Sequence, residues 1–103
     1  MLHKTFIPYL PNIIAILKKH NIQNACVFGS VLTDGFNDKS DIDFIVNLKL
    51  NLDPVEAGGH LWDTYYELKD LLKREIDLLA EPSLKNPYFI KEINETKFPI
   101  YGY

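Results

Sequence analysis

Cysteine, net positive charge and long apolar runs are all scarce in this sequence, and each scarcity excludes a class of protein. Cys26 is the one cysteine among 103 residues, so neither an internal disulfide nor a cluster of thiolate metal ligands can form. That usage suits a reducing compartment, and we expect the protein to be cytoplasmic. No segment reaches the ~18 apolar residues of a membrane-spanning helix, and the first ten residues do not resemble a secretion signal. We therefore expect no association with a membrane.

The charge balance argues against direct nucleic-acid binding. Lys and Arg number 11 against 14 Asp and Glu, which gives a formal net charge of -3. Proteins that bind a polynucleotide depend on basic side chains that neutralise its phosphates. The sequence has no such excess, so we expect no direct contact with nucleic acid.

The chain contains enough hydrophobic residues to form one core. Hydrophobic residues make up 47% of the sequence and aromatic residues 13%. Two halves of so short a chain would each be too small to bury an adequate core, so residues 1–103 are expected to form one domain. No internal repeat or low-complexity segment interrupts it.

Hydrophobic periodicity predicts helices that alternate with short strands. Apolar residues at helical spacing and short β-branched runs place the helices over 10–17, 54–73 and 89–93 and the strands over 24–28, 41–47 and 75–80. Asp53 before Pro54 is typical of a helix cap, and Ser83 or Asn86 is expected to cap the last helix. The tail 98–103 is expected to be extended. This alternation predicts an α/β fold in which helices cover a small mixed β-sheet, with a strand order that the sequence does not reveal.

Two aspartates carry the strongest chemical signal. Asp41 and Asp43 stand at i and i+2 of a predicted strand, so their side chains should project from the same face. Carboxylates on an apolar strand cost several kcal/mol per ion unless a counterion compensates, and no Lys or Arg lies within this strand. Magnesium accepts one or two carboxylates and completes its coordination with water and phosphate oxygens. The pair therefore predicts a site for magnesium and a nucleoside triphosphate.

Asp77 repeats the pattern on another predicted strand and could complete a three-carboxylate site. It would bind a second metal ion or accept the proton of an incoming hydroxyl. Gly29 ends the first strand, where the lack of a Cβ lets the backbone approach a phosphate, and Ser30 can donate a hydrogen bond to it.

Each of these residues also has an ordinary structural interpretation. Asp41 alone could be a turn residue, and Asp77 alone could form a surface ion pair with Lys73 or Arg74. A Gly-Ser pair after a strand is more often a plain turn than a phosphate site.

Gly29-Ser30, followed after ten residues by Asp41-Ile42-Asp43, resembles the signature of the DNA polymerase β-like nucleotidyltransferase superfamily. The short length, the later E-I-D-L-L run and the C-terminal helix are similar to the minimal nucleotidyltransferase family over nearly the whole chain. The resemblance implies that Gly29 and Ser30 hold the triphosphate and that the acids, joined by Asp77, bind magnesium and catalyse transfer.

The same resemblance implies a reaction and a partner. Members of that family transfer AMP from ATP to a hydroxyl, typically a tyrosine of a helical HEPN-type ribonuclease toxin, and so act as the antitoxin of a two-gene pair. We therefore expect a protein adenylyltransferase antitoxin, in a homo- or hetero-oligomer. Small-molecule nucleotidylation is a weaker interpretation, because so short a chain has little structure to form an acceptor pocket.

The stretch after Ser30 departs from the family pattern. Family members often carry an arginine soon after the Gly-Ser, whereas this chain has Val31, Leu32, Thr33 and Asp34, and Lys39 is the nearest cation. An acid near the phosphates would repel them. A second hypothesis follows: a catalytically weak or inactive module that neutralises a toxin by binding alone.

The histidines and two aromatic residues of the second helix say less about function than the acids do. His3, His20 and His60 show no metal-ligand spacing, so solvent or helix-end positions are expected for them. Trp62 and Tyr66 lie beside the apolar stripe of the second helix, and they either pack in the core or remain exposed for a partner.

Overall fold

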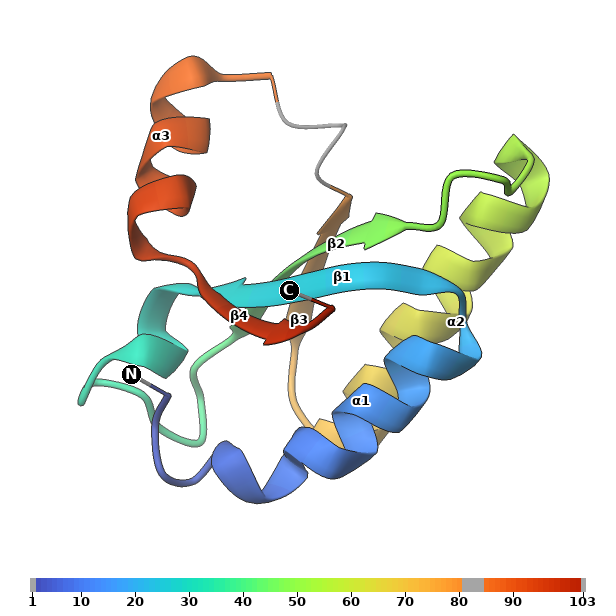
Figure 1. Ribbon diagram of the computed structural model, residues 1–103. Coiled ribbons are helices and arrows are strands. Elements are labelled where there is room, and N and C mark those ends of the chain that lie inside the picture. Colours follow the sequence, from blue (N-terminus) through green and yellow to red (C-terminus); the bar gives the residue numbers. More distant parts are fainter. Residues whose placement is uncertain (1, 81–84, 103) are drawn as a thin grey trace.

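The computed structural model describes residues 2–80 and 85–102, which form a four-stranded sheet and three α-helices (Figure 1). In chain order the elements are η1 (Ile7–Tyr9), α1 (Leu10–Lys19), β1 (Ile22–Phe28), η2 (Gly29–Leu32), β2 (Ile42–Leu48), α2 (Pro54–Leu72), β3 (Ile76–Ala80), α3 (Pro87–Thr96) and β4 (Phe98–Tyr101). The predicted α/β class and its alternation of helices and strands are confirmed.

The sheet has the order β3-β2-β1-β4. β1 pairs antiparallel with both β2 and β4, whereas β2 and β3 run parallel. A parallel pair needs a crossover connection, and α2 supplies it. The sheet is therefore mixed, as predicted, and its order places β2 and β3 side by side.

Helices α1 and α2 cover one face of the sheet and enclose the larger core. Their buried positions follow helical spacing, and the strand residues that meet them alternate along β2, as expected for one face of a strand. This core contains Ile13 and Leu17 of α1, Leu68 and Leu72 of α2, and Ile42, Phe44 and Val46 of β2.

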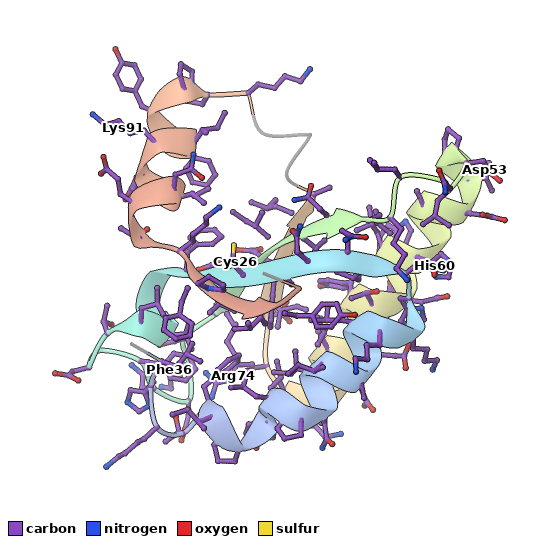
Figure 2. All side chains as sticks on the ribbon, in the orientation of Figure 1. Cys26, Phe36, Asp53, His60, Arg74 and Lys91 are labelled. Carbon is purple, nitrogen blue, oxygen red and sulfur yellow. The ribbon has the colours of Figure 1, made fainter. Side chains whose placement is uncertain are left out.

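Helix α3 lies on the opposite face (Figure 1). A smaller cluster forms there from Cys26, Ile45 and Ile93, with Phe28 and Leu79 packed against it. Cys26 is fully buried within β1 (Figure 2), consistent with a small apolar residue.

Two of the three helices begin at the caps that their sequences favour. The Asp53 carboxylate accepts hydrogen bonds from the backbone N–H groups of Val55 and Glu56 at the start of α2. The Asn86 side chain does the same for Tyr88 and Phe89 at the start of α3. The other cap considered for α3, Ser83, lies outside the described residues. A side-chain acceptor at each site satisfies N–H groups that a helix leaves without partners.

Some expected boundaries differ from the structure. β2 begins at Ile42, so Asp41 precedes the strand instead of opening it, and β1 begins two residues before the predicted Asn24. The extended tail is a strand in its own right, β4. None of the described helices combines the length and apolar character needed to cross a membrane.

Candidate active site

Asp43 and Asp77 are brought together by the pairing of β2 with β3. They are direct partners in the parallel register. Each alternates with residues that enter the larger core, so both carboxylates project from the face that α3 covers. Two acids that are 34 positions apart in the chain thus become neighbours on the sheet.

The environment of Asp43 favours its protonated form. Burial, a hydrogen bond with the Asp77 side chain and the negative charges of Asp77 and Asp41 together raise the pKa of Asp43 to about 6. Removal from water disfavours the charged carboxylate, and like charges nearby act in the same direction. A carboxylate whose pKa is raised by burial and by acids beside it is typical of sites that bind a cation or move a proton.

Asp41 contributes through its charge. It is exposed, just before β2, and its carboxylate is one of the charges that raise the pKa of Asp43. Within 2–80 and 85–102, no three His, Cys, Asp or Glu side chains are close enough to hold one metal ion. The described site therefore consists of a close pair, Asp43 with Asp77, and a third acid nearby.

Gly29 lies directly against this pair. Its φ of +81° is in the left-handed region, which glycine adopts without strain. A Cβ built on Gly29 would lie 2.6 Å from Oδ2 of Asp43, so only glycine leaves room for that carboxylate. The Ser30 hydroxyl donates to the backbone carbonyl of Asp41 at 3.4 Å, which links the turn to the start of β2.

The residues after Ser30 hold the turn in place. Val31 is completely buried in the larger core, so the position that follows the Gly-Ser carries no cation. The Thr33 hydroxyl donates to the carbonyl of Ser30 at 2.8 Å and accepts from the N–H of Gly35 at 3.2 Å. These contacts account for the local sequence by packing and turn geometry.

Arg74 supports the loop that leads to Asp41. Its Nη1 donates to the carbonyls of Asn37 and Ser40 at 2.8 and 2.9 Å, and its guanidinium lies 4.5 Å from the ring centre of Phe36 (Figure 2). The ion pair of Asp77 with Lys73 or Arg74, considered from the sequence, is not what the structure has. Lys73 instead pairs with Asp70 on the surface.

A cavity of about 520 Å³ adjoins Gly29, and we call it the α3 cavity. Phe28 comes from the end of β1, the turn contributes Gly29, Leu32 and Thr33, and α3 contributes Phe89, Glu92, Ile93 and Thr96. Phe28 and Phe89 meet edge to face, with ring centres 6.2 Å apart. The aromatic walls and a few polar groups are typical of a small-molecule pocket.

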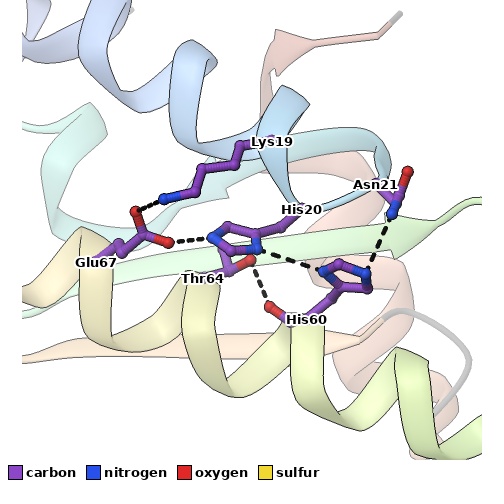
Figure 3. A network of polar contacts seen from close by, with 6 residues as sticks. All are labelled: Lys19, His20, Asn21, His60, Thr64 and Glu67. Carbon is purple, nitrogen blue, oxygen red and sulfur yellow. Dashed lines mark hydrogen bonds and ion pairs between the residues drawn. The ribbon is translucent and has the colours of Figure 1, made fainter.

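A polar cluster that the sequence did not predict joins α1 to α2 (Figure 3). His20 is buried, its Nε2 contacts the Glu67 carboxylate, and its Nδ1 lies 3.3 Å from Nδ1 of His60. The Asn21 amide donates to Nε2 of His60 at 3.1 Å, and Lys19 pairs with Glu67 at 2.8 Å. Isolated histidines forty residues apart give no local sequence signal for such a contact. His20 lies at the end of α1, as expected, but it is buried there, and His60 is a partly buried residue within α2.

Comparison with known proteins places this geometry in a family. The family model described as "Polymerase beta, Nucleotidyltransferase" matches residues 11–103. A protein of Methanocaldococcus jannaschii named "Putative protein adenylyltransferase MJ0128" is 34% identical over 85 residues, which cover 78% of this chain and 79% of that protein. A second from the same organism, "Putative protein adenylyltransferase MJ0435", is 36% identical over 75 residues, 70% of this chain and 73% of the relative.

Solved structures share the fold. A structure described as a "putative minimal nucleotidyltransferase" matches with a TM-score of 0.71 at 20% identity and covers 96% of each chain. A chain in a crystal structure of a toxin-antitoxin with AMP-PNP matches with a TM-score of 0.71 at 22% identity, over 91% of this chain and 73% of that one. A chain in the complex of a tri-AMPylated Shewanella oneidensis HEPN toxin with an MNT antitoxin gives 0.66 at 20% identity, covering 94% and 72%.

Proposed function

This chain belongs to the polymerase beta nucleotidyltransferase family, and from that membership we propose that it transfers AMP from ATP to a hydroxyl of a partner protein. The observation that carries the proposal is the pair Asp43 and Asp77 on adjacent strands, with Gly29 against the Asp43 carboxylate. The relatives named as protein adenylyltransferases support a protein as the acceptor.

In the proposed reaction, an acceptor hydroxyl oxygen attacks the α-phosphorus of ATP. One phosphorus–oxygen bond forms, and the bond from the α-phosphorus to the oxygen bridging toward the β-phosphorus breaks, so pyrophosphate leaves. The exposed Asp77 carboxylate accepts the hydroxyl proton, and Gly29 and Ser30 position the triphosphate. The α3 cavity adjoins Gly29 and receives the nucleoside.

The acids fit a divalent cation. Without a counterion, Asp43 in this pair is partly protonated near pH 6. A hard cation would offset both the cost of burying the Asp43 charge and its repulsion by Asp77. With Asp41 as a third acid nearby, the close pair Asp43 and Asp77 would hold magnesium. When bound, it would neutralise the charge that develops on the phosphate oxygens.

The test is label transfer from ATP. The chain is incubated with ATP labelled in the α-phosphate, magnesium and the protein encoded beside its gene, and that protein should become labelled. Asp43→Asn should reduce transfer by about a hundredfold or more. Asp70→Asn is the matched control, because Asp70 is an exposed acid paired only on the surface with Lys73, and it should leave the rate unchanged. Absence of transfer with every nucleotide tried would refute the proposal.

The relatives found in complexes support a narrower role. Structures of a toxin-antitoxin with AMP-PNP and of an AMPylated HEPN toxin with its antitoxin share this fold. We propose that the acceptor is a tyrosine of a helical HEPN-type toxin and that the chain acts as its antitoxin. Loss of the toxin's ribonuclease activity after labelling, and its return after removal of AMP, is the expected result.

One observation favours a second function, neutralisation of a toxin by binding alone. The residue after Ser30 is the buried Val31, so a basic side chain does not stand there beside the phosphates. That hypothesis predicts a stable complex with the toxin that forms without nucleotide and persists in Asp41→Asn, Asp43→Asn. Calorimetry with magnesium and ATP separates the two, because only the enzyme should bind the nucleotide.

A further inference from the structure

Over residues 76–79, the outer edge of β3 has no strand beside it in the part of the chain that the structure describes. β3 pairs with β2 on one side, and the order β3-β2-β1-β4 places no described strand on its other side. The opposite edge, β4, contains Pro99, which lacks the N–H that an added strand would need. β3 contains no proline. Of these two edges, β3 is therefore the one suited to accept another strand.

A groove of about 600 Å³ runs along this edge, and we call it the β3 groove. One wall is α2, and the other is formed by every residue from 75 to 79. Successive side chains of a strand point to opposite faces, so a cavity that touches five consecutive residues lies along the strand's edge and not on one face. An extended segment in the groove would thus lie beside the β3 backbone.

The α2 wall carries exposed aromatic side chains. Trp62 is 62% exposed and Tyr66 58% exposed, and their rings stack with centres 5.6 Å apart. Tyr65 meets both rings edge-on. Of the two interpretations of Trp62 and Tyr66 that the sequence left open, core packing is wrong. Large exposed aromatics gathered beside a groove are typical of protein-binding surfaces and are frequent binding hot spots.

The β3 groove is continuous with the candidate active site through Asp77. This residue lines the groove and is also the neighbour of Asp43. The α3 cavity adjoins the pair from the other side, at Gly29, whose missing side chain leaves room for the Asp43 carboxylate. The acids therefore lie between two cavities, as a transfer between two substrates requires.

We propose that the β3 groove binds the acceptor protein by an extended segment that adds to the edge of β3. Its backbone pairs with β3, its side chains contact Trp62 and Tyr66, and its hydroxyl-bearing residue reaches Asp77. Strand addition supplies affinity through main-chain hydrogen bonds and selectivity through side-chain pockets, which this edge and this aromatic wall provide. The proposal rests on the proposed function, because it names the substrate surface of that same site.

Kinetics with the acceptor protein test the aromatic wall. Trp62→Ala with Tyr66→Ala should raise the KM for the acceptor roughly tenfold or more and leave the KM for ATP within about twofold. Tyr88→Ala is the control, because Tyr88 is 85% exposed and lies on α3, away from the groove. An unchanged acceptor KM in the double variant, with wild-type transfer intact, would overturn the groove while the proposed function stands.

Hydrogen exchange tests the edge without depending on catalysis. Adding the acceptor protein should slow exchange of backbone amides within 75–79, also in Asp43→Asn, which cannot transfer AMP. Slowed exchange in a wild-type chain that transfers no AMP to the acceptor supports the groove and refutes the proposed enzyme. Unchanged exchange at saturating acceptor, or slowing that follows the concentration of this chain alone and so indicates a second copy, overturns the proposal.

Discussion

At the scale of single residues, Asp43 combines burial with the repulsion of two neighbouring acids. Its raised pKa means that the folded protein binds a proton more tightly than the unfolded chain between pH 3.8 and about 6. Stability therefore falls as the pH rises through that window and stays lower above it. At neutral pH the charged Asp43 carboxylate therefore lowers the free energy of unfolding of the metal-free protein, as expected for a functional position.

Asp43→Asn should accordingly stabilise the metal-free protein while it abolishes transfer. At pH 7.5 we expect a gain of about 1 kcal/mol, less than the full shift of the pKa would give because the site is partly open to solvent. The gain should shrink to a few tenths of a kcal/mol near pH 3.5, where Asp43 is mostly protonated in both folded and unfolded chains. Urea unfolding at the two pH values measures it, and a loss of stability at pH 7.5 would contradict the interpretation.

Gly29→Ala tests the close approach of backbone and carboxylate. The new methyl group would lie 2.6 Å from Asp43 Oδ2, and the residue would keep a φ of +81°. We expect a destabilisation of roughly 1–3 kcal/mol from these two effects, together with loss of nucleotide binding. Gly35→Ala is the control, since the added Cβ would meet Thr33 Oγ1 at 3.5 Å, an ordinary contact distance. Equal unfolding midpoints for the two variants would contradict the assignment.

At the scale of elements, the polar cluster of Figure 3 joins the end of α1 to the middle of α2. Its contacts form a consistent chain of donors: Asn21 donates to Nε2 of His60, which leaves its Nδ1 to donate to His20, whose Nε2 donates to Glu67. Thr64 adds a bond to the carbonyl of His60 at 2.6 Å.

His20→Ala should therefore loosen the contact between these helices. We expect a loss of about 2 kcal/mol, because a buried side chain and two of its hydrogen bonds disappear. Lys19→Ala is the control, since the Lys19 side chain is 64% exposed, and it should change stability by less than about 0.5 kcal/mol. Thermal unfolding of both variants at pH 7.5 makes the comparison, and equal effects would refute the role assigned to His20.

Glu67 gives this contact a dependence on pH. Lys19 and His20 hold the pKa of Glu67 below its ordinary 4.5. An acid with a lowered pKa stabilises the fold above its unfolded value, and that contribution is lost as the pH falls through the lowered one. The destabilisation caused by Glu67→Gln should thus be present at pH 7 and diminish below about pH 4.5.

The elements themselves were largely predictable, because their signals are local. Helical spacing in α1 and α2 and the cap Asp53 depend on nearby residues alone, and the structure confirms them. The partners of each strand could not be predicted, since one register of apolar residues fits several neighbours. The contact of His20 with His60 depends on how α1 and α2 pack in the assembled fold, so the sequence did not predict it either.

At the scale of the whole molecule, nucleotide binding should appear as added stability. A ligand that binds only the folded chain adds about 2.7 kcal/mol at one hundred times its Kd, a rise in Tm of roughly 10 °C or more for a chain of this size. Magnesium with ATP should produce this rise in the wild type and not in Asp43→Asn. A flat response in the wild type would favour the binding-only hypothesis.

The sequence named the residues of the candidate site but did not predict how they are arranged. Asp43 and Asp77 were identified from acids on apolar strands, but their direct pairing required the parallel order of β2 and β3. The sequence also suggested cations for Asp77 that serve elsewhere, because Arg74 reaches back to the loop carbonyls of Asn37 and Ser40. A long side chain such as that of Arg74 can reach several partners, and only the assembled fold determines which of them lie close enough to bind it.

The position of β4 has a consequence for synthesis on the ribosome. β1 lies in the interior of the sheet only because β4 pairs with it, and β4 follows about 70 residues later, which takes roughly 4 to 14 s to translate. During that interval the apolar β1 has an unpaired edge that another nascent chain could occupy. Chains that stop before Phe98 should therefore aggregate during expression, and co-translational chaperones should be retained on this protein until β4 has emerged.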